Sequence, residues 1–282
     1  HKAIRRQRQM CIRDRYGYRA FFKRVEGMNP RDPEIKSTLY LKHLGSVGIS
    51  WCNLNEDNLV DVLIGRVGGL SDKEIEYTVG ALRASNPILS NQLVSDRKVE
   101  ICLRMSIARA VADGYVAIGD SAFMTMPLMG SGIESSMKAG KMFADYVEEN
   151  KIDEFTAKNM WGFYHKYMTT LGADFAFVDV LKRWALSLDS KTIDWVFGGG
   201  LIEKSDLALV TTDTSGEKPK MSAKSIIKKV FLLLGHFGLV CKAIGCLTKS
   251  LKAKSIAKKI PAEYDEKKLA KWTKKYNKLI KN

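Results

Sequence analysis

The first third of the chain has the period-two alternation of a small antiparallel sheet. Alternation at 38–43 and apolar runs at Ile49–Cys52 and Leu59–Ile64, separated by a turn at 53–58, predict three strands. Ser71 is followed three positions later by Glu74, which is a capping box. This spacing predicts a helix from Asp72 to about Arg83, ended by Asn86-Pro87.

Farther along the chain, helical spacing dominates. The apolar run Tyr115–Gly119 predicts a buried strand, and Val99–Leu103 a shorter one. Apolar positions from Ile133 to Val147 recur at helical spacing and predict an amphipathic helix to about Glu149. Aromatic-rich residues 155–197 predict two helices, whose aromatic side chains we interpret as packing residues. Gly198–Gly200 predicts a turn.

These patterns divide the chain into five parts. Residues 1–15 lack periodicity and resemble a translated sequencing adapter, so we interpret them as non-native. Residues 16–150 hold the predicted sheet and helices, and a family resemblance at 119–133 implies that they form a substrate sheet and the carboxyl-terminal half of a cofactor domain. The remaining parts are a helical region at 151–210, a polar linker at 211–222 and a basic helical tail at 223–282.

Composition narrows the class of protein. Hydrophobic residues make up 45% of the chain and charged residues 27%, which is typical of a soluble globular protein. Neither an apolar run long enough to cross a bilayer nor a secretory signal is evident. The five cysteines are odd in number and form no CxxC pair, and the histidines have no partner at metal-ligand spacing. We therefore expect neither a disulfide framework nor a metal site, and a cytoplasmic location.

The net charge of +15 is concentrated at the two ends of the chain. Residues 201–282 hold 19 basic and 7 acidic residues, whereas residues 51–200 hold 15 and 20. Within the tail, Ile226–Leu247 combines lysines with an apolar helical face. Two interpretations stay open: a peripheral helix on an anionic membrane surface, or a helix packed on the main domain. Aromatic platforms on which bases could stack are few in the tail, with Trp272 and Tyr276 as the candidates, so we do not expect a nucleic-acid partner.

The segment Asp113–Gly140 carries the clearest chemical signal. It predicts a strand ending at Gly119-Asp120, a glycine-bearing loop and a helix that begins near Gly132. A carboxylate at such an edge can accept hydrogen bonds from polyol hydroxyls, and a helix amino terminus favours a negative charge on a ligand. Both features suit a flavin, because reduced flavin carries negative charge near its pyrimidine edge.

This segment resembles the second FAD-binding motif of the geranylgeranyl reductase group, within the p-hydroxybenzoate-hydroxylase-like flavoproteins. The family pattern is Gly-Asp, Ala or Ser, Ala, a Pro and then Gly-x-Gly-Ile. It is matched here by Gly119, Asp120, Ser121, Ala122, Pro127, Gly130, Gly132 and Ile133. The resemblance implies that Asp120 binds the ribityl or pyrophosphate part of FAD. It also implies that Gly130–Ile133, with Ser131, face the isoalloxazine ring, and that Trp51 lies near the substrate pocket.

The resemblance covers roughly 16–147 and implies a mixed α/β fold. This would be part of a Rossmann-type FAD/NAD(P)-binding flavoprotein, with an antiparallel substrate sheet and a helical carboxyl-terminal region. The family's first motif, Gly-x-Gly-x-x-Gly, occurs nowhere in the chain. We therefore expect an amino-terminally truncated protein, and the adenosine site cannot be carried over.

The implied activity is an FAD-dependent reduction. Hydride would pass from reduced flavin to an apolar, isoprenoid-type substrate, with NAD(P)H as electron donor. We identify no catalytic acid or base in the sequence. This agrees with a flavin reduction, in which the cofactor itself transfers the hydride. Two alternatives are a flavin monooxygenase or halogenase of the same fold, and a non-enzymatic protein that binds membrane surfaces through its basic tail.

Overall fold

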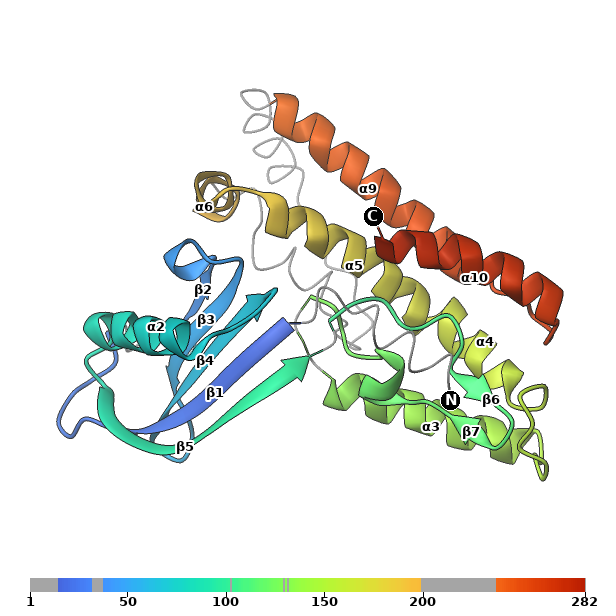
Figure 1. The fold of residues 1–282 in the computed structure, drawn as a ribbon, viewed down its shortest axis with the longest axis horizontal. Helices are drawn as coiled ribbons and strands as arrows, with labels where there is room; N and C mark the ends of the chain where they lie inside the picture. Colours follow the sequence, from blue (N-terminus) through green and yellow to red (C-terminus); the bar gives the residue numbers. More distant parts are fainter. Residues whose placement is uncertain are drawn as a thin grey trace, which may run out of the picture. The chain divides into compact units, whose positions relative to one another are not determined.

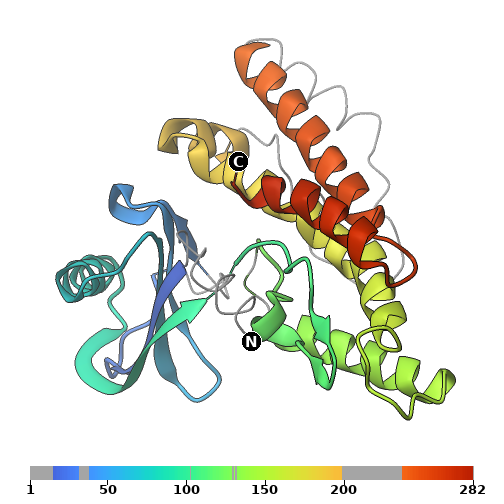
Figure 2. The same cartoon turned by 45° about the vertical axis from the view of Figure 1, so that its right-hand side comes forward.

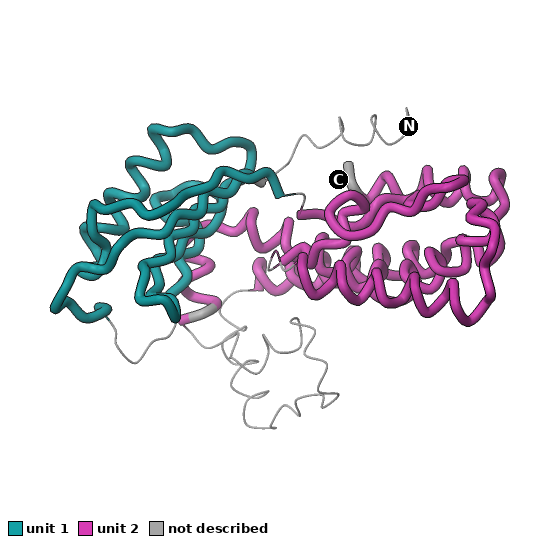
Figure 3. Tube along the Cα trace, turned by 90° about the horizontal axis from the view of Figure 1, so that it is seen from below, with its two compact units in different colours: residues 1–102 teal, residues 103–282 magenta. Residues whose placement is uncertain are grey.

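The computed structural model describes residues 15–31, 38–101, 103–128, 130, 132–198 and 237–281. The chain forms two compact units (Figure 3), one ending at Cys102 and one beginning at Leu103. This boundary falls inside the region expected at 16–150. Residues 1–14 and 201–236, for which the sequence predicts a non-native segment, part of the helical region, the linker at 211–222 and the start of the tail, lie outside the described residues. Cys102 and Ser131 also lie outside them.

Unit 1 is an antiparallel sheet with one helix against it (Figure 1). The strand order is β2-β3-β4-β1-β5. The elements in chain order are β1 (Arg15–Arg24), β2 (Leu39–Leu41), the 3-10 turn η1 (His43–Gly45), β3 (Gly48–Leu54), β4 (Leu59–Val67), α2 (Asp72–Ser85) and β5 (Leu89–Ile101). The predicted sheet is confirmed, but the short strand expected at Val99–Leu103 is the end of the 13-residue strand β5.

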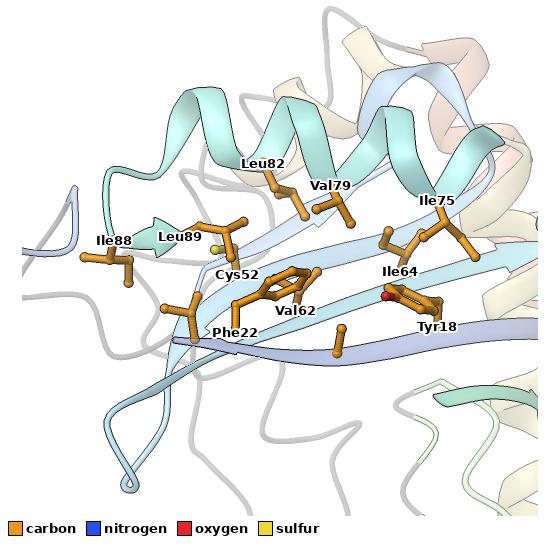
Figure 4. Packing of buried hydrophobic residues seen from close by; sticks show 12 residues of the cluster. Tyr18, Phe22, Cys52, Val62, Ile64, Ile75, Val79, Leu82, Ile88 and Leu89 are labelled. Atoms are coloured by element: carbon orange, nitrogen blue, oxygen red, sulfur yellow. The ribbon is translucent and has the colours of Figure 1, made fainter. Parts of the chain in front are cut away.

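Strand β1 lies between β4 and β5, and sequence reasoning did not predict it. Its aromatic and basic composition hid the alternation of Tyr18, Ala20 and Phe22, all of which are buried. Figure 4 shows how the apolar side chains of α2 meet those of the sheet. This core contains Tyr18, Phe22, Cys52, Val62, Ile64, Ile75, Val79 and Leu82.

Helix α2 begins where the capping box places it. The Ser71 hydroxyl accepts a hydrogen bond from the Glu74 N–H at 3.3 Å. The Glu74 carboxylate is held by the guanidinium of Arg66 at 2.9 Å and by the hydroxyl of Ser46 at 3.0 Å. Arg66 is itself buried, and its remaining N–H groups donate to main-chain and hydroxyl oxygens. Glu74 therefore ties the start of α2 to the sheet.

Burial makes the thiol of Cys52 in unit 1 unreactive. Burial and the Asp61 carboxylate raise the pKa of Cys52 to about 12, so the thiol stays protonated at neutral pH. Because an unfolded thiol ionises near pH 9, this group favours the folded state below that pH, and its contribution is lost as the pH rises toward 12. We expect alkylation at pH 8, followed by peptide mapping, to modify exposed Cys241 and leave Cys52 unmodified. Equal labelling of the two peptides in folded protein would contradict this burial.

Unit 2 is mainly helical (Figures 1 and 2). It contains the two-stranded ladder β6 (Val111–Ala112) and β7 (Tyr115–Val116), the 3-10 turn η2 (Gly119–Ala122), α3 (Ile133–Glu149), α4 (Trp161–Thr169), α5 (Leu171–Ser187), α6 (Ser190–Gly198), α9 (Phe237–Lys258) and α10 (Glu266–Lys281). None of the described helices combines the length and the hydropathy that crossing a bilayer requires.

Two expectations for unit 2 need correction. The strand expected at Tyr115–Gly119 is only two residues long, because β7 pairs with β6 and no other described strand lies beside Ala117 and Ile118. The strand pairs among the described residues are all antiparallel, so a parallel Rossmann layer is not among them. The two helices expected at 155–197 are three, because the backbone at Thr170 leaves the helical region.

The aromatic residues of α4 pack inside unit 2, as interpreted from the sequence. Trp161, Phe163, Tyr164 and Tyr167 are at most 2% exposed. The Trp161 indole N–H donates to the carbonyl of Pro261 at 2.8 Å, so this core also holds the carboxyl-terminal helices. The mixed fold with an antiparallel sheet and a helical carboxyl-terminal region is thereby confirmed.

Candidate functional site

The Gly119-Asp120 motif forms a tight turn. Gly119 has a φ of +68°, a value at which glycine carries no steric penalty. The N–H groups of Phe123 and Met124 return to the carbonyl oxygens of Asp120 and Gly119, at 3.1 and 2.9 Å. The turn is therefore closed by its own backbone, and the side chains of Asp120 and Ser121 are exposed.

Two glycines bring this turn against the start of helix α3. A Cβ on Gly119 would lie 2.8 Å from the hydroxyl of Ser136, and a Cβ on Gly132 would lie 3.0 Å from the hydroxyl of Thr125. The Gly132 position is also 3.5 Å from Oδ1 of Asp120. Larger residues would push the turn and the helix apart, so the glycines of the motif allow Asp120 to approach the helix amino terminus.

This junction combines a carboxylate with the start of a helix. Oδ1 of Asp120 accepts a hydrogen bond from the Thr125 hydroxyl at 2.5 Å. Helix α3 begins at Ile133, and its N-cap residue Gly132 has no side chain with which to cap the first turn. A helix of this length adds partial positive charge there. The structure thus places a carboxylate next to the positive end of a helix.

The other predicted residues lie around the same turn. Pro127 is buried, and Gly130 has a φ of +75° with its N–H bonded to the carbonyl of Met126 at 3.0 Å. The apolar face expected on α3 needs correction at its start: Ile133 is 81% and Met137 70% exposed, while Ser135 and Ala139 are buried. The small residues face unit 2, because only they fit beside the turn.

An irregular segment at 103–110 contacts the turn through Ser106 and Arg104. The Ser106 hydroxyl donates to the carbonyl of Phe123 at 3.1 Å and shares a 2.7 Å hydrogen bond with Tyr167. Burial raises the pKa of Tyr167 above its ordinary value, so its hydroxyl stays protonated. The Arg104 guanidinium lies 4.0 Å from the centre of the Phe123 ring, and its buried Nε has no hydrogen-bond partner among the described atoms.

Sequence reasoning missed Thr125, Ser136 and Phe123. Their roles depend on contacts with Asp120, Gly119 and Arg104, which are set by the fold and leave no trace in residue spacing. Phe123 and Thr125 lie inside the matched Gly-Asp to Gly-x-Gly-Ile segment, and that position is the one sequence signal that could have identified them.

Trp51 lies in unit 1, on the sheet face opposite α2. Across the strands it pairs with Leu39 and Leu63, and its indole Nε1 is buried without a described hydrogen-bond partner. The neighbouring row contains Gly65 and Gly17, which pair directly. Side chains of the adjacent strands occupy the space above them, because a Cβ on Gly65 would lie 3.2 Å from Cγ1 of Ile49 and one on Gly17 would lie 3.1 Å from Cγ2 of Val99. The face is therefore apolar around Trp51.

Comparison with known proteins places these features in context. No profile of a known protein family matches the chain. The chain is 26% identical over 163 residues to digeranylgeranylglycerophospholipid reductase of Sulfolobus acidocaldarius, which covers 57% of this chain and 36% of the relative. It is 24% identical over 151 residues to digeranylgeranylglycerophospholipid reductase 1 of Methanococcoides burtonii, with 52% and 36% covered.

The fold is similar to that of a geranylgeranyl bacteriochlorophyll reductase-like protein from Thermoplasma acidophilum. The TM-score is 0.59 at 16% sequence identity, and the match covers 84% of this chain and 55% of that structure. The chain spans a little over a third of the length of the curated relatives it matches. The chain is therefore related to the geranylgeranyl reductase-type oxidoreductases, in sequence over about a third of their length and in fold over most of its own.

Proposed function

We propose that this chain carries the isoalloxazine-facing part of an FAD site and belongs to an oxidoreductase that reduces an apolar, isoprenoid-type substrate. The observation that carries the proposal is the junction of the Gly119-Asp120 turn with the amino terminus of α3. Gly132 leaves a cradle there that a Cβ would fill, between Thr125 and Asp120.

The donors and acceptors of this junction fit a flavin. Asp120 can accept hydrogen bonds from ribityl hydroxyls, and the uncapped N–H groups of α3 can stabilise negative charge on the pyrimidine edge. Bound FAD supplies the hydride chemistry, for which NAD(P)H is the electron donor we propose. The protein's share is to hold the ring, to favour its reduced state and to exclude water.

The open sheet face of unit 1 supports an apolar substrate. The row Leu39, Trp51 and Leu63 offers apolar surface, and Ile49 and Val99 continue it in the neighbouring row. An extended hydrocarbon chain suits such a surface, because apolar area is buried without polar groups that need partners. The relatives named for digeranylgeranyl lipids are in line with this choice.

Substrates of this kind reside in membranes, so we also propose a cytoplasmic protein that works at an anionic membrane surface. The basic carboxyl-terminal helices are the part of the chain suited to that contact.

Replacing Asp120 with alanine is expected to remove most of the flavin. The protein expressed from its complete reading frame should show flavin absorption bands in the visible range, and Asp120→Ala should weaken FAD binding about tenfold or more, which is the loss of a charged hydrogen bond. Asp194→Ala, an exposed carboxylate in the same unit, is the matched control and should leave binding unchanged. A colourless wild-type protein after addition of FAD would remove the flavin proposal.

Oxygen uptake separates reduction from the oxygen-activating alternative. A reductase should consume NAD(P)H in step with saturation of the isoprenoid double bonds and without rapid oxygen uptake. Rapid uptake accompanied by a hydroxylated or halogenated product would replace the reductase assignment with the monooxygenase or halogenase alternative.

A further inference from the structure

Helix α9 buries its small residues and exposes its large ones. It lies along α5 in unit 2 (Figures 1 and 2). Its buried positions follow helical spacing and are small: Cys246, Ser250, Ala253 and Ala257. Small side chains let two helices approach closely, so the buried positions of α9 need no large apolar residue, and Leu239, Val240 and Ile256 are half-buried.

The large apolar residues form a ridge on another side of the helix. Phe237 is 77% exposed, Ile244 59%, Leu247 48% and Leu251 54%. Steps of seven, three and four residues place them along one stripe. We call these four residues the α9 ridge. Soluble proteins scatter exposed apolar residues, whereas a continuous stripe indicates a binding surface.

The charge around the ridge has one sign. Helix α9 contains no acidic residue, and its lysines are Lys242, Lys249, Lys252, Lys254 and Lys258. Lys254 pairs with Asp174 on α5. Helix α10 directs Leu269, Trp272 and Tyr276 inward and exposes further lysines. At helical spacing Lys252, Lys254 and Lys258 flank the ridge, whereas Lys242 and Lys249 lie nearer to the opposite side of the helix. The surface beside the carboxyl-terminal half of the ridge is therefore basic.

We propose that the α9 ridge docks on the surface of an anionic lipid bilayer. The apolar side chains enter the interface and the lysines contact the headgroups. The helix is about 33 Å long at 1.5 Å per residue, which suits a position parallel to the membrane plane. This inference rests on the membrane-surface part of the proposed function and names the residues that make the contact, while a vesicle measurement tests it independently of the flavin site.

Other occupants fit the same surface less well. A second copy of the chain would bring lysines against lysines, because α9 offers no acidic residue to pair with them. Nucleic acid would satisfy the lysines but leave the apolar ridge exposed to water. A bilayer surface presents anionic headgroups within a few ångströms of apolar lipid chains, so it can bind the lysines and the α9 ridge together.

Vesicle co-sedimentation of the full 282-residue chain tests the proposal. Phosphatidylcholine vesicles with phosphatidylglycerol should bind the protein at low salt, and pure phosphatidylcholine should bind it on the order of tenfold less. Ile244→Ser with Leu247→Ser and Leu251→Ser should weaken binding about tenfold or more. The control replaces exposed apolar residues in unit 1, Tyr77→Ser with Leu93→Ser and Val94→Ser, and should bind like wild type.

A charge series tests the second feature. Lys252→Glu with Lys258→Glu, two exposed lysines that flank the ridge, should weaken binding on the order of tenfold or more. Lys23→Glu with Lys73→Glu changes the net charge equally in unit 1 and should have a much smaller effect. Circular dichroism should show that all variants keep the wild-type fold, because every replaced side chain is exposed.

Three results would overturn the proposal. One is the absence of binding to anionic vesicles at low salt. Another is equal binding by the ridge variant and wild type, which would reduce the contact to charge alone. The third is a ridge-dependent dimer in light scattering without vesicle binding, which would assign the ridge to a second copy of the chain.

Discussion

Replacing Gly48 with alanine is expected to destabilise unit 1 by about 3 kcal/mol or more. A Cβ at this position would lie 1.9 Å from the carbonyl oxygen and 2.9 Å from the carbonyl carbon of Gly65. These are backbone atoms of the neighbouring strand, in register with Gly48 through the Gly48–Arg66 pair. They cannot yield as a side chain would, so relief requires β3 and β4 to separate beneath α2.

Thermal unfolding followed by circular dichroism measures this effect. The matched control is Gly80→Ala on the exposed side of α2, where a Cβ meets nothing within 4 Å. Alanine stabilises a helix interior by up to about 1 kcal/mol relative to glycine, so this variant should melt at or above the wild-type temperature. If Gly48→Ala melts like Gly80→Ala, the close approach of β3 and β4 is incorrect.

Replacing Lys182 with methionine is expected to destabilise unit 2 by about 3 kcal/mol or more. Its ammonium group lies 2.6 Å from Oδ1 of Asp179, with side-chain exposures of 5% and 4%. It also donates to the carbonyl of Leu103, at the start of the segment that supports the Gly119-Asp120 turn. Removing the cation leaves a buried carboxylate whose remaining cation, Arg183, is 3.4 Å away.

A fall in Tm of several degrees is the expected readout, together with loss of flavin binding if the segment behind the turn moves. Lys141→Met removes an exposed pair with Asp145 and should leave the Tm unchanged. Asp179→Leu combined with Lys182→Met removes both charges and should recover much of the loss. A single Lys182→Met variant as stable as Lys141→Met would show that the buried pair does not hold this segment.

Local pattern alone determined several elements of this protein. Ser71 and Glu74 set the start of α2, because a cap depends only on residues within one turn. The apolar recurrence from Ile133 gave α3 its observed bounds, and the Gly-Asp to Gly-x-Gly-Ile spacing located the candidate site. Each of these signals lies within a few residues of the structure it specifies.

Contacts between distant residues decided the rest. Strand β1 joins the sheet through partners at least 36 residues away, and in α3 Ser135 and Ala139 are buried while Ile133 stays exposed. Helix α9 likewise directs its small side chains toward α5 and its large ones to solvent. Sequence periodicity shows that a helix has two faces, but which face is buried depends on the element that packs against it, and that is settled only in the tertiary structure.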